Sequence, residues 1–177
     1  ILGLLKENQT TQVMLFSNSQ SKTQETNLIY YQIKKELEEK KKQGQSVNIQ
    51  EYNIDSNSDF DTEEFVRDIF VNGGTLPDVL VCMDEVVTEC VYQALVDYNE
   101  VGNVDVVGFY YSDVILDAIS KGIISSAIAL DMKEIGTYSV NALVEYSSLG
   151  HTSSYYSVGQ HVINKNNVRT YRTGEGY

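Results

Sequence analysis

Polar and aromatic side chains follow the apolar segments of this sequence, at the points where strands are expected to end. Asp84 and Asp131 each come directly after such a segment, as do Tyr110 and Tyr111, with Asp113 two residues further on. Carboxylates that meet at one place can act as general acid and base. An aspartate that precedes an amphipathic pattern is also a common helix N-cap, and we favour this explanation for Asp84 and Asp131. We therefore predict no catalytic residue and no enzymatic activity.

Motifs that bind phosphates or metals are absent from the sequence. There is no Walker-type glycine loop, no Gly-x-Gly-x-x-Gly pattern and no Gly-x-Ser-x-Gly elbow. The only histidines, His151 and His161, lie in the tail without a convergent set of metal ligands. Asp55, Asp59 and Asp61 do not follow the spacing of a calcium loop, so turn chemistry explains them better. We expect no metal site and no cofactor.

Composition restricts the class of protein further. The chain has 177 residues, of which 42% are hydrophobic and 21% charged, as is typical of one globular domain. A formal net charge of −12 argues against a nucleic-acid partner, because such proteins usually present a basic face. No segment approaches the roughly 20 apolar residues of a membrane span, so we expect no direct membrane insertion.

The two cysteines and the first residue allow two smaller inferences. Cys82 and Cys90 fall in apolar patterns without a disulfide signature, so we expect two small buried hydrophobic residues. Because the sequence begins at Ile1, we expect a processed chain or an excised piece.

Strand and helix patterns alternate from Thr11 to Leu149. This order predicts an α/β fold: a doubly wound, mostly parallel sheet with helices on both faces. In such sheets, ligands bind beyond the carboxyl ends of the strands. The predicted strands are 11–17, 47–54, 78–83, 104–109, 123–130 and 155–163. The predicted helices are 1–7, 22–43, 61–72 with Asp61 as its cap, 84–98, 112–121 and 131–149, the last entered through a capping box of Asp131 and Glu134.

The order of these motifs resembles the type I periplasmic solute-binding proteins and, more distantly, the effector domains of sugar-responsive repressors. The segments that carry the resemblance are PDVLVCMDEVVTECVYQAL, VDVVGFYYSDVILDAISKGIISSAIALDMKEIGTYSVNAL and HVINKNNV. Members of this family clamp a ligand between two lobes. The resemblance implies that residues 1–177 form a single α/β domain, the second lobe plus the final crossover segments, and that the first lobe is largely missing.

The resemblance also places the family's ligand contacts on this sequence. The family's arginine falls near Asn27, its asparagine on Asp84, its aspartate on Tyr110 and its crossover glutamine near Leu130. None of these is the family's usual residue, which implies either a different ligand or no ligand. Tyr110 and Tyr111 could stack on a sugar ring or an aromatic solute. Alternatively, one ring fills space under a loop and the other lies on the surface. The candidate ligand-binding residues are Asn27, Asp84, Tyr110, Tyr111, Asp113 and Asp131.

Two functions remain from this comparison. The first is a small-molecule recognition domain, for a sugar or similar solute, in a bacterial extracytoplasmic transport or signal-sensing protein. The second is a degenerate lobe that serves as a dimerisation or docking module without a ligand. An enzyme of flavodoxin-like or receiver-like topology is a weaker third, because Ser17 and Asn18 do not supply a receiver's acidic cluster.

The helix expected at 131–149 bears on both functions. In the family it would pack onto the missing first lobe. Its apolar face is formed by Ile135, Tyr138, Ala142 and Tyr146 and needs another partner in this chain. We expect that partner to be the same lobe, another chain such as a second copy or a partner lobe, or the rest of a longer protein.

Overall fold

The computed structural model describes the backbone of residues 1–19, 24–55 and 58–173, and the side chains of these residues except 24–28. Its centre is a six-stranded sheet in the spatial order β2-β1-β3-β4-β5-β6. Neighbouring strands are parallel, except that β6 runs antiparallel to β5. The strands are β1 (Thr11–Asn18), β2 (Val47–Ile54), β3 (Val79–Cys82), β4 (Asp105–Phe109), β5 (Ser126–Leu130) and β6 (Gln160–Asn164).

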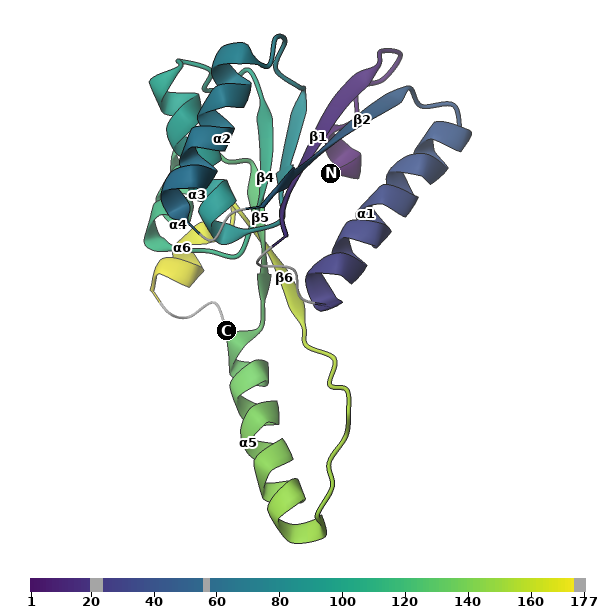
Figure 1. The fold of residues 1–177 in the computed structure, drawn as a ribbon, viewed down its shortest axis with the longest axis vertical. Helices are drawn as coiled ribbons and strands as arrows, with labels where there is room; N and C mark the ends of the chain where they lie inside the picture. The colour runs from purple at the N-terminus through teal and green to yellow at the C-terminus, as the bar shows by residue number, and fades with distance from the viewer. Residues whose placement is uncertain (20–23, 56–57, 174–177) are drawn as a thin grey trace.

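Helices cover both faces of this sheet, which confirms the predicted fold class (Figure 1). α2, α3, α4 and α6 lie on one face, and α1 lies on the other beside the short 3-10 helix η1. The bounds are η1 (Leu2–Leu4), α1 (Gln24–Lys42), α2 (Asp59–Asn72), α3 (Glu85–Asp97), α4 (Asp113–Lys121), α5 (Met132–Leu149) and α6 (Val168–Arg172).

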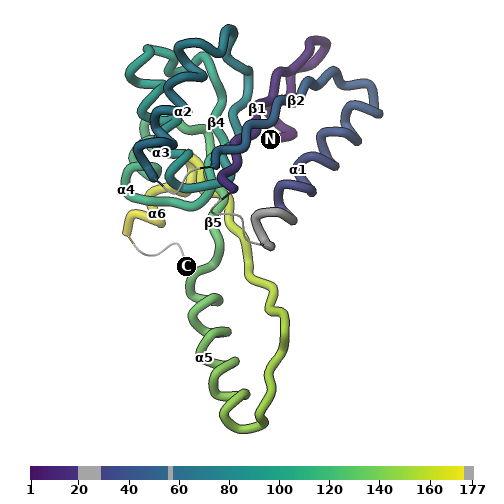
Figure 2. Tube along the Cα trace, viewed as in Figure 1, coloured from purple at the N-terminus to yellow at the C-terminus, as the bar shows by residue number. Residues whose placement is uncertain are grey.

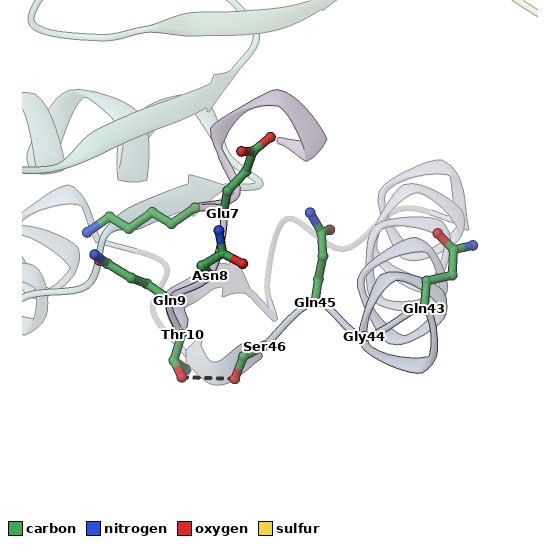
Figure 3. Close-up of a pocket in the computed structure, with 9 residues that line it drawn as sticks. Glu7, Asn8, Gln9, Thr10, Gln43, Gly44, Gln45 and Ser46 are labelled. Atoms are coloured by element: carbon green, nitrogen blue, oxygen red, sulfur yellow. Dashed lines mark hydrogen bonds between the residues drawn. The ribbon is translucent and has the colours of Figure 1, made fainter.

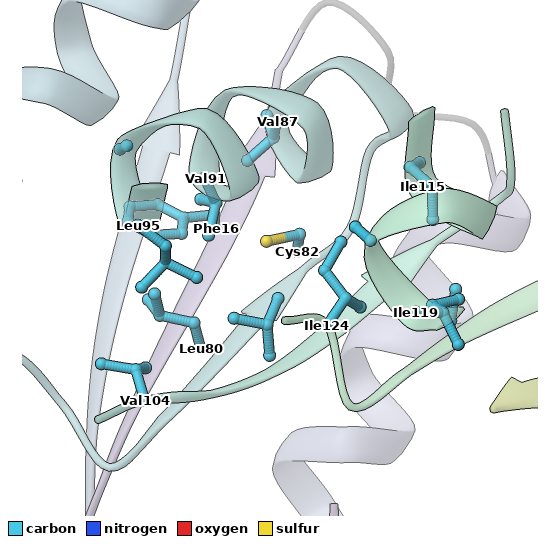
Figure 4. Close-up of a cluster of buried hydrophobic side chains, with 14 of the residues drawn as sticks. Phe16, Leu80, Cys82, Val87, Val91, Leu95, Val104, Ile115, Ile119 and Ile124 are labelled. Carbon is cyan, nitrogen blue, oxygen red and sulfur yellow. The ribbon is translucent and has the colours of Figure 1, made fainter. Parts of the chain in front are cut away.

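The core has two layers because alternate side chains of a strand point to opposite faces of the sheet. In β1, Met14 and Phe16 belong to the layer under α2, α3 and α4, whereas Val13 and Leu15 belong to the layer under α1. All four residues of β3 are buried, as expected for a parallel strand covered on both sides. Cys82 lies inside the larger layer, among residues such as Val87 and Val91 (Figure 4). Both cysteines are free.

Three boundaries differ from the sequence-based expectation. The N-cap of α2 is Ser58, whose extended backbone lets its side chain accept the amide of Asp61, so the prediction of Asp61 as the cap was wrong. The expected helix at 1–7 is only the single turn η1. β6 begins at Gln160 rather than at 155, because its partner β5 ends at Leu130, the residue paired with Gln160.

The capping box predicted at Asp131 and Glu134 is half formed. Asp131 does cap α5, since its carboxylate accepts the Glu134 amide at 2.9 Å. The Glu134 carboxylate does not return to the cap residue. It accepts the amide of Gly159 at 2.7 Å, and the Asp131 amide donates to the Gly159 carbonyl. The base of α5 is therefore fastened to the returning chain.

Residues 131–159, which we call the arm, leave the body of the molecule. α5 extends from the end of β5, and the chain returns beside it to β6 (Figures 1 and 2). The two limbs are joined by Tyr138 and Tyr156, whose rings stack 5.5 Å apart. Glu145 accepts the hydroxyl of Thr152 at 2.7 Å.

α5 buries none of its residues. Ile135, Tyr138 and Ala142 of the expected apolar face are partly covered, whereas Tyr146 is 61% exposed. Val140, Leu143, Val144 and Leu149 are exposed by 60% to 72%. The apolar surface of the arm is consequently broader than the predicted stripe. In the described part of the chain, no helix has the length and apolar character needed to cross a membrane.

Candidate functional site

Sheet register brings the ends of three parallel strands to the same level. Phe16 pairs with Cys82, and Val81 pairs with Val107, so the chain leaves β1, β3 and β4 side by side. Asp84 follows the end of β3 by two residues, and Tyr110 follows the end of β4 directly. The loops that were expected to carry ligand contacts therefore share one edge of the sheet, which we call the carboxyl edge.

The predicted site residues occupy different places relative to this edge. Asp84 and Tyr110 stand directly on it, and Tyr111 follows Tyr110. Asp113 is exposed in the first turn of α4, and Asp131 lies where β5 gives way to the arm. Asn27 belongs to α1, but its side chain lies outside the described residues.

Thr88 links the residue that caps α3 after β3 to the last residue of β4. Its hydroxyl donates to the Asp84 carbonyl at 2.7 Å and accepts the amide of Phe109 at 3.2 Å. The Asp84 carboxylate caps α3 by accepting the Val87 amide at 3.2 Å. The preference for a cap at Asp84 is thus confirmed. Sequence reasoning missed Thr88, although its position one helical turn after the cap is a usable signal.

Gly108 lets Thr88 approach β4 this closely. A β-carbon at Gly108 would lie 2.5 Å from the Thr88 methyl carbon. That distance is far below ordinary van der Waals contact, so only glycine fits without movement of Thr88. Close packing against Thr88 therefore explains why the Val-Val-Gly-Phe segment has a glycine at this position.

The tyrosine pair forms part of an aromatic row. The rings of Tyr110 and Tyr111 stack 6.1 Å apart at an angle of 13°, and Tyr111 meets Tyr171 of α6 edge to face at 5.9 Å. Tyr111 also packs against the larger core layer. Tyr111 thus has a packing role, whereas half-buried Tyr110 faces Met132 on the arm. Nothing in the sequence pattern indicated the contribution of Tyr171.

Carboxylates dominate the carboxyl edge. From the exit of each of the five parallel strands to the first helical residue, the described residues, which leave out 20–23 and 56–57, include no lysine or arginine. Burial raises the pKa of Glu85, and the neighbouring charges of Glu89 and Asp84 raise it further. Glu89 accepts a short hydrogen bond from the Ser112 hydroxyl. An anion approaching this edge meets like charge that partial burial strengthens. The acidic residues are Asp55, Asp59, Asp84, Glu85, Asp113 and Asp131.

Asp131 differs from the other carboxylates because both the Glu134 amide and the His161 ring lie within hydrogen-bonding distance of its carboxylate. The Glu134 amide that it caps lowers its pKa, and His161 on β6 contributes in the same direction. Asp131 Oδ2 lies 3.5 Å from His161 Nε2. Together with the two bonds to Gly159, this cluster ties the start of the arm to its end.

Two hollows lie away from the carboxyl edge. The larger, about 490 Å³, lies at the opposite end of β1 and β2, between residues 6–10 and 43–46 (Figure 3). The Thr10 and Ser46 hydroxyls are hydrogen-bonded across its floor at 2.9 Å. The smaller, about 460 Å³, lies on the arm beside the stacked rings of Tyr138 and Tyr156 and is also lined by Glu145 and Ser153. Within the described residues, no group of acidic, cysteine or histidine side chains could hold a metal ion.

Comparison with known proteins supports this fold. No protein-family model matches the sequence, and no curated protein matches it. Solved structures do match. An ABC transporter solute-binding protein from Agrobacterium vitis, bound to α-D-tagatopyranose, is 19% identical with a TM-score of 0.75, over 90% of this chain and 51% of that one. One from Bacillus halodurans with bound myo-inositol is 15% identical with a TM-score of 0.76, over 95% and 55%.

A third match is XylFII in its complex with LytSN, which is 20% identical with a TM-score of 0.67, over 89% of this chain and 54% of that one. The chain thus spans about half the length of each of these proteins. At this level of identity the likeness concerns the fold. The chain has the fold of one lobe of the type I periplasmic-binding-protein superfamily.

Proposed function

We propose that this chain is a solute-recognition lobe of a bacterial extracytoplasmic protein, which closes with a second lobe around a small molecule. The observation that carries the proposal is the carboxyl edge shared by the parallel strands β3 and β4, which Asp84 and Tyr110 follow. Ligands of open α/β sheets bind at such an edge. Solved proteins of this fold hold α-D-tagatopyranose and myo-inositol.

In this proposal, residues 1–177 are the second lobe together with the final crossover segments. The arm then crosses to the first lobe, and the bonds among Asp131, Glu134 and Gly159 mark the hinge. An isolated helix rich in Gly, Thr, Ser, Val and Asn is marginal in water, so α5 needs a surface that covers it. A first lobe would supply that surface.

The carboxyl edge favours an uncharged or cationic solute over an anion. Its carboxylates repel an anion, while its partly buried carboxylates and the ring of Tyr110 suit hydroxyls, an amine or an apolar ring face. The family's usual polar contacts are replaced at Asp84 and Tyr110. We therefore expect a solute other than the family's common sugars, or a sugar held by ring stacking.

A sensor role fits these departures better than bulk sugar uptake. XylFII, of the same fold, was solved with a second protein, LytSN. The expected location is extracytoplasmic, as for the periplasmic ribose ABC transporter protein of Conexibacter woesei.

The alternative is a lobe without a ligand that serves as a dimerisation or docking module. The exposed residues Val140, Leu143 and Val144 favour it, since an apolar surface on a protruding helix invites association. This alternative predicts a dimer that forms through α5 and no stabilisation by solutes.

A thermal-shift screen of the full-length protein separates the two functions. The panel contains sugars, aminosugars, nucleosides, amino acids and autoinducer-like solutes. A solute at a hundred times its dissociation constant should stabilise the folded state by about 2.7 kcal/mol. Tyr110→Ala should abolish the shift, whereas Tyr31→Ala, an exposed tyrosine on α1, should keep it. No shift with any solute, together with concentration-dependent dimerisation, would support the docking function instead.

A further inference from the structure

The backbone of Tyr110 adopts a conformation that a tyrosine rarely takes. Its φ is +69°, in the left-handed region, which is uncommon for a bulky residue. Neighbouring bonds impose this conformation. The Tyr110 amide donates to the Ile128 carbonyl of β5 at 2.7 Å, and the preceding amide, of Phe109, donates to Thr88 at 3.2 Å. The left-handed turn directs the chain away from the line of β4.

The ring of Tyr110 reaches from this turn to the base of the arm. Its hydroxyl contacts the sulfur of Met132, the first residue of α5. The ring is flanked by Phe109 at 6.0 Å and by Tyr111 at 6.1 Å. Tyr111 in turn rests on Tyr171 and on the core. The side chain thus has one end supported by the body and the other end on the arm.

The base of the arm has a second set of contacts of a different kind. Asp131, Glu134, Gly159 and His161 bond to one another, and they belong to the two limbs of the arm and to β6. These bonds hold the two limbs of the arm together at its base. The contact between Tyr110 and Met132 instead joins the arm to the loop after β4, which lies on the carboxyl edge.

We propose that Tyr110 is a positioning residue that couples the carboxyl edge to the direction of the arm through Met132. This inference rests on the proposed function, in which a solute lies at that edge. A solute that stacks on the ring changes the freedom of the Tyr110 side chain, and the contact with Met132 changes with it. The left-handed backbone keeps the Tyr110 ring within reach of both the solute and Met132. Occupancy of the edge thereby biases one arm direction over another.

The coupling is tested first without any solute, by double electron–electron resonance between one spin label on the body and one on the arm. The labels are carried by Val71→Cys on α2 and Ser147→Cys on α5, both at exposed positions. Half-buried Cys90 is replaced by alanine. Cys82 stays, because its burial raises the pKa of its thiol and shields it from the label. The variants are Tyr110→Phe, Met132→Leu and the combination of both.

Each single variant should raise the population of a second body-to-arm distance by about two- to ten-fold, as expected for the loss of one weak contact. The double variant should match the single variants, because all three lose the same contact. The urea midpoint should stay unchanged, which separates an effect on arm direction from one on folding. Equal distance distributions in parent and variants would overturn the coupling, as would additive effects in the double variant.

A second experiment keeps this inference apart from the proposed function. The same labelled proteins are measured with the solute that gives the largest thermal shift. The distance distribution should move in the parent and stay fixed in Tyr110→Phe. A solute that binds without moving the arm of the parent refutes the coupling and leaves the proposed function standing. A panel without any binding refutes the proposed function, and the measurement without solute still decides whether Tyr110 positions the arm.

Discussion

Replacing Gly108 by alanine tests how the carboxyl edge is built. The new β-carbon would lie 2.5 Å from the Thr88 methyl carbon and 3.3 Å from its hydroxyl oxygen. Overpacking of this kind destabilises a protein by about 1–3 kcal/mol. Alanine in place of a strand glycine regains about 0.5–1 kcal/mol of backbone entropy. We therefore expect Gly108→Ala to lower the free energy of unfolding by about 1–2 kcal/mol.

Thr88→Ser provides the partner for a double-mutant cycle. Serine removes the methyl group that alanine would strike and keeps the hydroxyl that accepts the Phe109 amide. Alone it should destabilise by about 1 kcal/mol, for one buried methyl group. In the double variant the clash is gone, so the loss should be smaller than the sum of the single losses by about 1–2 kcal/mol.

Urea unfolding followed by far-ultraviolet circular dichroism measures all four proteins. The slope of the unfolding free energy against urea concentration (the m value) should stay constant, since none of these changes alters the surface exposed on unfolding. Gly136→Ala on α5 is the matched control, because nothing lies within 4 Å of its β-carbon position. It should stabilise the helix by about 0.5–1 kcal/mol. If the stability loss of the double variant equals the sum of the two single losses to within about 0.5 kcal/mol, the packing argument is refuted.

Two further predictions concern single carboxylates. Asp131→Ala removes the cap of α5 and should weaken the arm by about 1 kcal/mol, seen as faster amide exchange in α5 with unchanged exchange in α3. Asp117 lies next to Lys121 and Arg172, which lower its pKa from the usual 3.8. Its contribution to stability is therefore present above pH 3.8 and is lost as the pH falls through the lowered pKa. Asp117→Asn should flatten the acid limb of stability against pH, and an unchanged limb would contradict this.

Local patterns were sufficient to predict the body of the fold. The continuous apolar run of β3 and the alternation of strands and helices specify a covered parallel sheet. Gly122, with φ at +76°, ends α4 in the left-handed conformation that glycine favours. These features depend on neighbours in sequence, so one chain is enough to infer them.

Features that depend on residues far apart in sequence were not predictable in the same way. The ring of Tyr171 contacts that of Tyr111 although the two residues are 60 positions apart in the sequence, and only the placement of α6 brings them together. The periodicity of α5 identified an apolar face but could not show that the helix leaves the body. The choice of Ser58 over Asp61 as a cap depended on backbone conformation at the loop before α2. Candidate side chains were thus predictable by strand position, whereas their partners were not.

Amide chemical-shift mapping of the full-length protein, titrated with the solute panel, tests the central claim most directly. The account predicts that a bound solute shifts the amides of residues 84–85 and 110–113 most strongly, because those loops form the carboxyl edge. Shifts confined to residues 6–10 and 43–46, at the opposite end of β1 and β2, would contradict it. So would a panel in which no solute shifts any amide of the carboxyl edge.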